Sequence, residues 1–400
     1  MQRQQTDILI SGGGVAGLTA AAAFGAEGFN VICVDPAPPV TNVKDKGADL
    51  RTTAFLQPSQ ALLDRIGLWE RFAPYAMPLD VMRIVDAGGE EPVARVERDF
   101  VAKELGDLPF GWNLPNWLLR REIVARLSEL PNVDFRAGTG FARMLSRTGE
   151  ALVTLSDGTS VEARLVIGAD GRDSPVRDAA GIGCKTFRYG QKAIVFAVTH
   201  DAPHGNVSTE VHRTGGPFTL VPLPDHDGRP FSAVVWMEQG PEAMRLAALS
   251  EAEFEVEATR RSAGVNGDLR LVGRRQVWPI IAQLADRMSA ERVALLAEAA
   301  HVVPPIGAQG LNMSLADLTA LLTLACDGRD RLGDRAMLDA YNRQRHAEVA
   351  LRVRGVDALN RASIAGSPTL RDLRARGIEA LYGLKPVRRG LMKLGLGAGG

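Results

Sequence analysis

Near the amino terminus, glycines recur with the spacing of a turn that binds the phosphates of a dinucleotide. The residues of this turn and of the helix that it opens are Gly12, Gly14, Val15, Ala16 and Gly17. In such a turn the first glycine permits a tight bend, the second lets a pyrophosphate approach the backbone, and the third lets the helix pack on the preceding strand. The N–H groups at the helix start attract phosphate oxygens. The pattern predicts a bound dinucleotide and does not distinguish FAD from NAD.

A carboxylate follows the glycine turn at the separation expected for a ribose ligand. Asp35 ends the apolar run 31–35, 23 residues after Gly12. At the end of the second strand of a dinucleotide-binding unit, an acidic side chain accepts hydrogen bonds from ribose hydroxyl groups. We therefore assign Asp35 to the same site.

A second loop suited to a cofactor lies late in the chain, where His301–Asn312 reads HVVPPIGAQGLN. Its prolines and glycines allow a rigid loop to bring bare backbone against a flat ring. The N–H groups at the start of the helix that follows can stabilise negative charge on that ring. The residues assigned to this loop are Pro305, Gly307, Gly310, Leu311 and Asn312.

These two segments and a third resemble the three signatures of the group A FAD-dependent aromatic hydroxylases, which share the p-hydroxybenzoate hydroxylase-like fold. The third segment, LVIGADGRDSPVR, is similar to the family pattern Asp-Gly-x-x-Ser-x-x-Arg and supplies Asp170 and Arg177. The resemblance implies that both residues lie near the FAD pyrophosphate and the path of NAD(P)H. It also implies that Glu298, which follows Ala297 where the family has Gly-Asp, binds the ribityl chain of FAD.

Three further stretches resemble the ubiquinone-biosynthesis hydroxylases of the UbiH type. They are DLRTTAFLQPSQALLDRIGLW at 49–69, GPFTLVPLP at 216–224, and Val235-Trp236. This resemblance implies that Arg51 lies beside the flavin. It also implies that Arg120 is the basic residue near FAD, with Arg121 as the alternative.

The activity that the resemblance implies is hydroxylation of the aromatic ring of a polyprenyl phenol, through a C4a-hydroperoxyflavin. O₂ is the co-substrate, and NAD(P)H or another electron donor is the reductant. No catalytic side chain is assigned. Two alternatives stay open: a flavin monooxygenase that acts on a soluble aromatic compound, and a non-catalytic flavoprotein scaffold in a biosynthetic complex.

The elements that position these loops alternate between strand and helix at first and become β-rich later. Helices are expected over 15–28, 58–66, 117–130, 311–325 and 336–359. Strands are expected at 8–10, 31–35, 151–155, 160–167, 193–199, 218–221, 231–237, 276–280 and 292–297. A strand, glycine turn, helix and strand form a βαβ unit with parallel strands.

We therefore expect an α/β fold with two interleaved domains and C-terminal helices. Residues 1–184 and 281–365 are assigned to a Rossmann-type FAD-binding domain with a parallel sheet. Residues 185–280 are assigned to a mostly antiparallel β-sheet domain that binds substrate. Residues 366–400 are assigned to a basic helical segment.

Composition excludes several other classes of protein. The 47 basic and 47 acidic residues give a net charge of zero, which argues against nucleic-acid binding. Three cysteines without CxxC spacing and six histidines without ligand spacing argue against a metal site and against a disulfide framework. No apolar run has the length of a membrane-spanning helix, and the short polar start does not resemble a secretory leader. We expect a cytoplasmic protein.

The last thirty residues carry a local excess of positive charge within this neutral chain. Seven basic residues, interleaved with apolar ones, are opposed by Asp372 and Glu379 only. This pattern predicts peripheral contact with the inner face of a membrane, or with other ubiquinone-biosynthesis proteins. The alternative is a helix packed on the FAD-binding domain with a solvated basic face.

Overall fold

The glycine turn joins two parallel strands of an eight-stranded sheet, as the alternation of apolar runs and helix predicts. In the computed structural model, which describes residues 3–364, 382–383 and 385–396, β1 (Gln4–Ser11) pairs in parallel with β2 (Val31–Asp35). β1 also pairs in parallel with β11 (Ser160–Gly168). The sheet order is β17-β18-β11-β1-β2-β8, with β10 and β9 continuing from β11. Its other strands are β8 (Val133–Ala137), β9 (Phe141–Ser146), β10 (Ala151–Leu155), β17 (Ser289–Ala290) and β18 (Val293–Leu295).

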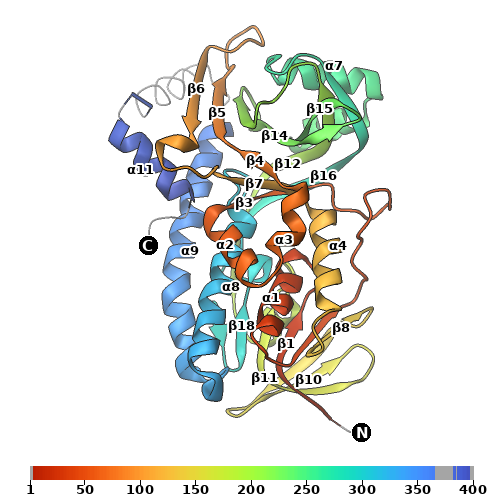
Figure 1. The fold of residues 1–400 in the computed structure, drawn as a ribbon, viewed down its shortest axis with the longest axis vertical. Helices are drawn as coiled ribbons and strands as arrows, with labels where there is room; N and C mark the ends of the chain where they lie inside the picture. Colours follow the sequence, from red (N-terminus) through yellow and green to blue (C-terminus); the bar gives the residue numbers. More distant parts are fainter. Residues whose placement is uncertain (1–2, 365–381, 384, 397–400) are drawn as a thin grey trace.

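Helices bury one large apolar core against this sheet (Figure 1). They are α1 (Val15–Ala26), α2 (Gln57–Arg65), α3 (Trp69–Phe72), α4 (Asn116–Leu127), α5 (Pro175–Ala179), α8 (Gln309–Asp327) and α9 (Arg335–Ile364). The run of alanines in α1 is fully buried, which lets α1 lie close to both the sheet and α4. This layer fixes the amino end of α1 and therefore the glycine turn.

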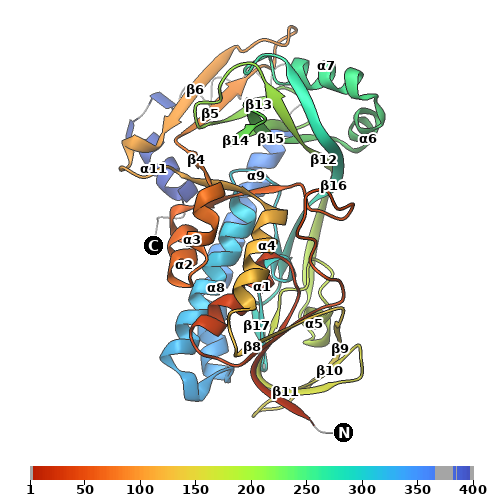
Figure 2. The ribbon, with the colours of Figure 1, turned by 45° about the vertical axis from the view of Figure 1, so that its right-hand side comes forward.

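A second eight-stranded sheet forms the other end of the molecule (Figures 1 and 2). Its order is β19-β16-β12-β15-β14-β13-β5-β6, and all pairs are antiparallel except β13 with β5. The strands are β5 (Val81–Asp86), β6 (Val96–Val101), β12 (Cys184–His200), β13 (Val207–His212), β14 (Pro217–His226), β15 (Arg229–Gln239), β16 (Leu269–Ala285) and β19 (His301–Val302). α6 (Gly240–Ala248) and α7 (Glu251–Arg261) cover its outer face.

Residues 81–101 differ from the sequence expectation, which placed them in the FAD-binding domain. β5 pairs with β13 and β6 pairs with β5, so both strands belong to the second sheet. The pairing joins segments more than a hundred residues apart, and local hydrophobic patterning does not encode such a partner. A small third sheet, β3-β7-β4, lies at the junction, with β3 (Thr52–Leu56), β4 (Met77–Leu79) and β7 (Gly111–Pro115). The α/β class with a mostly antiparallel second sheet is confirmed, and the domain limits stay a proposal.

The carboxyl-terminal part of the described chain is α11 (Lys385–Leu396), which lies beside α9 and the small third sheet in Figure 1. Much of the basic segment predicted at 366–400 lies outside the described residues. Among the helices that the structure describes, none is long and apolar enough to span a bilayer.

Candidate cofactor-binding site

The glycine turn divides into two positions that the fold requires and one that faces open space. Gly12 has φ of 122°, and a Cβ there would lie 2.2 Å from the carbonyl oxygen of Ala169. A Cβ on Gly17 would lie 2.0 Å from the carbonyl oxygen of Gly12. A Cβ on Gly14, by contrast, would meet no atom within 4 Å. The bare backbone at the start of α1 therefore has room for a pyrophosphate, and Gly14 has no side chain that caps the helix.

Asp35 is held against this turn by backbone donors. Its Oδ2 accepts a hydrogen bond from the Gly13 N–H, and its Oδ1 accepts one from the Ala37 N–H at 2.8 Å. A carboxylate oxygen has more than one acceptor position, so a ribose hydroxyl group can still donate to it. The structure brings Asp35 and the glycine turn together, as predicted.

Arg51 and Arg120 meet at one buried carboxylate. Asp49 accepts hydrogen bonds from Arg51 Nε at 2.9 Å and from Arg51 Nη2 at 2.8 Å, and Arg120 Nη2 lies 3.8 Å from Asp49 Oδ2. Burial acts to raise the pKa of Asp49, but the hydrogen bonds from Arg51 and Asn116 and the charges of Arg51 and Arg120 together hold the pKa below its usual value. Arg121 turns elsewhere, toward Glu122. Of the two alternatives, the structure places Arg120 beside Arg51.

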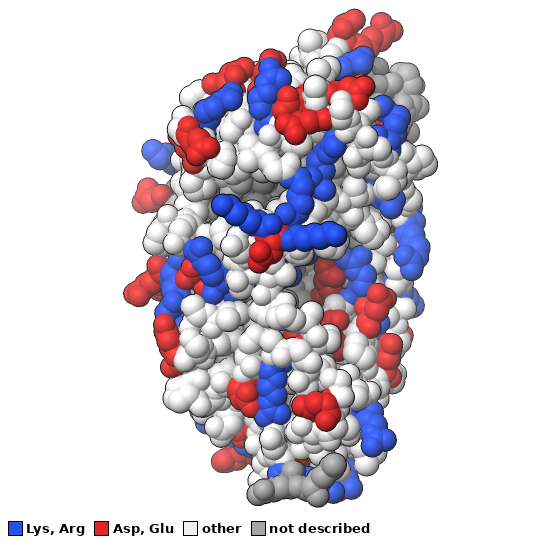
Figure 3. Space-filling view, turned by 90° about the vertical axis from the view of Figure 1, so that its right-hand side faces the viewer, with Lys and Arg blue, Asp and Glu red and all other residues white. Residues whose placement is uncertain are grey.

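Arg51 also lies at the junction of the two sheets. Its guanidinium carbon is 4.5 Å from the ring centre of Trp278 on β16, and its side chain is 36% exposed. Such a cation held over an aromatic face keeps a fixed direction. Lys and Arg side chains gather around a hollow on the face that lies at right in Figure 1 (Figure 3). A positive surface of this kind suits an anionic cofactor.

Asp170 and Arg177 both make hydrogen bonds within the protein. Asp170 Oδ2 accepts hydrogen bonds from Ser11 Oγ and the Val176 N–H, both at 3.2 Å, and burial raises its pKa. Arg177 is 5% exposed and donates to the carbonyl oxygens of Arg172 and Ala299. Asp170 thus fixes the turn after β11 to β1, and Arg177 fixes it to the 297–299 segment. Their contact with FAD stays a prediction.

Glu298 lies in a short 3-10 helix, Ala297–Ala299, at the end of β18. Its Oε2 is 3.3 Å from Arg172 Nη2, and its side chain is 41% exposed. Burial acts to lower the pKa of Arg51, but Asp49, with a smaller effect from Glu298, raises it above its usual value. Ala297 has φ of 56°, a left-handed conformation that costs a non-glycine residue about 1–2 kcal/mol. This explains why glycine suits the position that Ala297 occupies.

The loop from Val303 to Ala308 presents bare backbone outward and apolar side chains inward. Pro305, Gly307 and Gly310 are exposed, while Ile306 is buried. Gly307 has φ of 63°, and a Cβ on Gly310 would meet no atom within 4 Å. The loop can therefore approach a flat ring closely with its backbone.

The helix after this loop begins at Gln309, two residues before the predicted start at Leu311. The N–H groups without a partner inside the helix are therefore those up to Leu311, since the first four donors of a helix have none. Asn312 instead uses its side chain within the protein. Its Oδ1 accepts from the Leu56 N–H and Ser59 Oγ, and its Nδ2 donates to the carbonyl oxygens of Ala54 and Ala308. Asn312 thus joins the loop to β3 and α2.

A buried ionic network, which the sequence did not reveal, holds the other end of the loop. His301 Nε2 lies 2.6 Å from Asp317 Oδ2 on α8, and Arg345 Nε on α9 donates to Asp317 Oδ1 at 2.7 Å. All three side chains are at most 7% exposed. The feature of the sequence that could have indicated this network is the presence of a charged residue, Asp317 or Arg345, among the buried positions of each helix.

The loop also faces an apolar wall from the second sheet. Ile306 packs in one cluster with Val195, Met237 and Ile280, and with Val356 of α9. Parts of both sheets therefore meet at the loop. An aromatic ring placed here would be shielded from water.

The comparisons with known proteins agree with this arrangement. A family model described as an FAD binding domain matches residues 5–356. The ubiquinone hydroxylase UbiL of Rhodospirillum rubrum is 34% identical over 395 residues, covering 98% of this chain and 89% of the relative. The chain belongs to this family of FAD-dependent monooxygenases. The prediction of FAD as its cofactor is confirmed.

Other relatives and solved structures extend the match over the whole chain. The 3-demethoxyubiquinol 3-hydroxylase of Escherichia coli is 26% identical and covers 99% of this chain and 100% of the relative. The crystal structure of p-nitrophenol 4-monooxygenase PnpA from Pseudomonas putida has a TM-score of 0.79 at 20% identity, covering 99% of each chain. That of Pseudomonas aeruginosa PqsL in complex with 2-aminobenzoylacetate has a TM-score of 0.76 at 21% identity, covering 94% of this chain and 100% of the other. These two structures establish the shared fold.

Replacing Gly14 by valine separates cofactor binding from folding. A Cβ at this position meets no atom within 4 Å, so we expect the fold to survive, but the valine side chain fills the space at the start of α1 that a pyrophosphate needs. We expect the purified variant to lose its FAD, measured by flavin absorbance, while its circular dichroism stays that of the unmodified protein.

Gly106→Val is the matched control, because a Cβ at Gly106, as at Gly14, meets no atom within 4 Å and Gly106 is exposed. It should retain full FAD occupancy. Full occupancy in the Gly14 variant would show that the phosphates bind elsewhere.

Proposed function

We propose that this monooxygenase hydroxylates the aromatic ring of a polyprenyl phenol in ubiquinone biosynthesis. The observation that carries the proposal is the 34% identity with the ubiquinone hydroxylase UbiL over 98% of the chain. The apolar wall around Ile306 supports it, because a polyprenyl phenol requires an apolar site. In the net reaction, a ring C–H, O₂, NAD(P)H and a proton give a ring C–OH, NAD(P)⁺ and water.

The residues around the glycine turn fit the polar parts of FAD. The N–H groups at the start of α1 would bind the pyrophosphate, and Asp35 would accept from the ribose. Glu298 would accept from the ribityl chain, and Arg51 and Arg120 would hold the cofactor from the junction of the sheets. When bound, FAD supplies the redox chemistry that activates O₂.

The protein contributes orientation and exclusion of water at the reacting ring. The exposed backbone of Gly307 and Gly310 would face the flavin, and the helix start after it would stabilise negative charge. The apolar side chains of the second sheet would hold the phenol ring on the opposite side. Removal of water strengthens every polar contact within such a site.

Quinone analysis in a strain that lacks the gene tests the proposed function. We expect mass spectrometry to show less ubiquinone and an accumulated polyprenyl phenol that lacks one hydroxyl group. The gene for the unmodified protein should restore ubiquinone, the Gly106→Val gene should do the same, and the Gly14→Val gene should not. Unchanged ubiquinone in the deletion strain would contradict the proposal.

We also propose that α11 brings the enzyme to an anionic membrane surface, where a polyprenyl substrate resides. Lys385, Arg389 and Lys393 are exposed on α11. Arg388 turns inward to Glu104 at 2.7 Å, and Met392 packs in a small apolar cluster with Phe110. The helix thus combines a packed face with a basic one, and each basic residue near anionic lipid contributes about 1 kcal/mol.

Charge reversal at these three positions tests the membrane proposal by liposome flotation. We expect the full-length triple variant Lys385→Glu, Arg389→Glu, Lys393→Glu to lose binding to anionic vesicles. The matched control reverses Lys185, Arg287 and Arg335, which are exposed elsewhere, and should float like the unmodified protein. Equal flotation of all three proteins, or of none, would refute a role for α11.

A further inference from the structure

A polar cavity lies on the outer side of the second sheet, away from the flavin loop. It has a volume of about 220 Å³ and is lined by Arg213, Thr214, Trp236, Glu238, Glu242, Glu257, Arg260 and Arg261. Side chains alternate across β15, so Val235 and Met237 pack toward the wall at Ile306 while Trp236 packs under α7. The cavity is therefore separate from the proposed substrate site and lies one sheet thickness from it.

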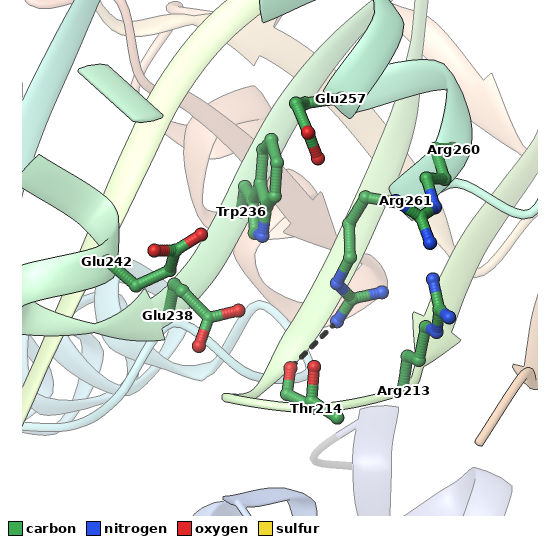
Figure 4. Close-up of a pocket in the computed structure, with 8 residues that line it drawn as sticks. All are labelled: Arg213, Thr214, Trp236, Glu238, Glu242, Glu257, Arg260 and Arg261. Atoms are coloured by element: carbon green, nitrogen blue, oxygen red, sulfur yellow. Dashed lines mark hydrogen bonds between the residues drawn. The ribbon is translucent and has the colours of Figure 1, made fainter. Parts of the chain in front are cut away.

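Charges of opposite sign are separated across this cavity. Figure 4 shows Glu238 and Glu242 on one side and Arg213, Arg260 and Arg261 on the other. Burial raises the pKa of Glu238, the hydrogen bond from Gln239 and the charge of Arg261 oppose that rise, and the charge of Glu242 adds to it. Like charges placed side by side repel unless a counter-charge lies between them.

Three side chains that line the cavity are more than nine-tenths buried, so the site is built into the fold. Glu238 is 8% exposed, Trp236 is 3% exposed and Arg261 is 5% exposed. Arg261 donates to the carbonyl oxygens of Val211 and Thr214, which fixes the turn on the cationic side. A Cβ on Gly215, which has φ of 72°, would lie 1.6 Å from Glu238 Oε1, so the carboxylate rests against bare backbone.

One of these buried groups, the indole of Trp236, has no hydrogen-bond partner among the described residues. Glu238 accepts a hydrogen bond from the Gln239 N–H at 2.9 Å, and burial raises its pKa while the positive charge of Arg261 opposes that rise. The indole N–H of Trp236 is buried and has no hydrogen-bond partner within 3.5 Å among the residues that the structure describes. It points into the cavity in Figure 4. A buried donor without an acceptor is costly.

We propose that this cavity binds a small zwitterion of amino-acid size. The ligand's ammonium group lies against Glu238 and Glu242, and its anionic group lies against Arg260 and Arg213. The indole N–H of Trp236 donates to the ligand between these two ends. A free amino acid and the head group of an aminophospholipid share this chemistry.

Isothermal titration of the full-length, FAD-loaded protein tests the proposal. The probes are glycine, γ-aminobutyrate and O-phosphoethanolamine, which differ in the separation of their charges. Acetate and ethylammonium, which each carry one of the two charges, are the controls. We expect at least one zwitterion to bind with one-to-one stoichiometry, and both single-charge compounds to bind at least about tenfold more weakly.

Two variants show whether the binding occurs in this cavity. Glu238→Gln keeps the shape and removes the charge, and Arg260→Gln changes an exposed residue on the opposite side. Each should weaken the zwitterion about tenfold or more. Glu251→Gln, an exposed residue of α7 outside the cavity, should leave binding unchanged.

Binding of O-phosphoethanolamine together with phosphatidylethanolamine vesicles would identify a lipid head group as the source, and binding of the amino acids alone would identify a free metabolite. No heat with any zwitterion at millimolar concentration would overturn the proposal. Undiminished binding in both the Glu238 and the Arg260 variants would also overturn it.

Discussion

The buried carboxylate of Asp317 holds together the parts of the molecule that meet at the flavin loop. It is fully buried and is neutralised by Arg345 of α9, while His301 at the end of β19 binds its other oxygen. Taking a carboxylate out of water is costly, and only close and complete pairing offsets that cost. Because the three residues come from a strand and two helices, any large shift of one element breaks the pairing. The position of the first residue of the segment His301–Asn312 is therefore fixed.

Other contacts hold the rest of the loop and the turn after β11 in place. Asn312 fixes the far end of the loop to β3 and α2, and Arg177 fixes the turn after β11 to Ala299. Ile306 anchors the middle of the loop to the apolar wall of the second sheet. The glycine turn, the Asp49 cluster and the loop thus occupy one junction between the sheets. This arrangement leaves bare backbone exposed on the loop, where we propose that the flavin binds, and it places the apolar side chains of the second sheet beside that loop.

The sequence predicted those parts of the site that depend on local backbone geometry. Gly12 and Gly17 have the tight contacts that their spacing implied, and Asp35 lies against the same turn. Parts that depend on distant partners were not predictable. The pairing of β5 with β13, the inward direction of Arg177, and the network at Asp317 all join residues far apart in sequence. The start of α8 at Gln309 was not predicted, because Gly310 is a poor helix former and interrupts the helical pattern. In the structure, the hydrogen bond from Asn312 Nδ2 to the carbonyl oxygen of Ala308 stabilises this first turn.

The most direct test of this account is the affinity for FAD and the stability of the Asp317→Asn variant. The change removes the buried carboxylate that pairs with Arg345 and leaves Glu348 as the remaining carboxylate beside that guanidinium. Loss of one member of a buried ion pair costs about 3–5 kcal/mol. Asp339→Asn on the same helix as Arg345 is the matched control, because its carboxylate is 35% exposed and its loss should cost no more than about 0.5 kcal/mol. We predict that Asp317→Asn lowers the free energy of unfolding by several times the control value and raises the dissociation constant for FAD. A variant with the FAD affinity and the unfolding free energy of the unmodified protein would contradict the account.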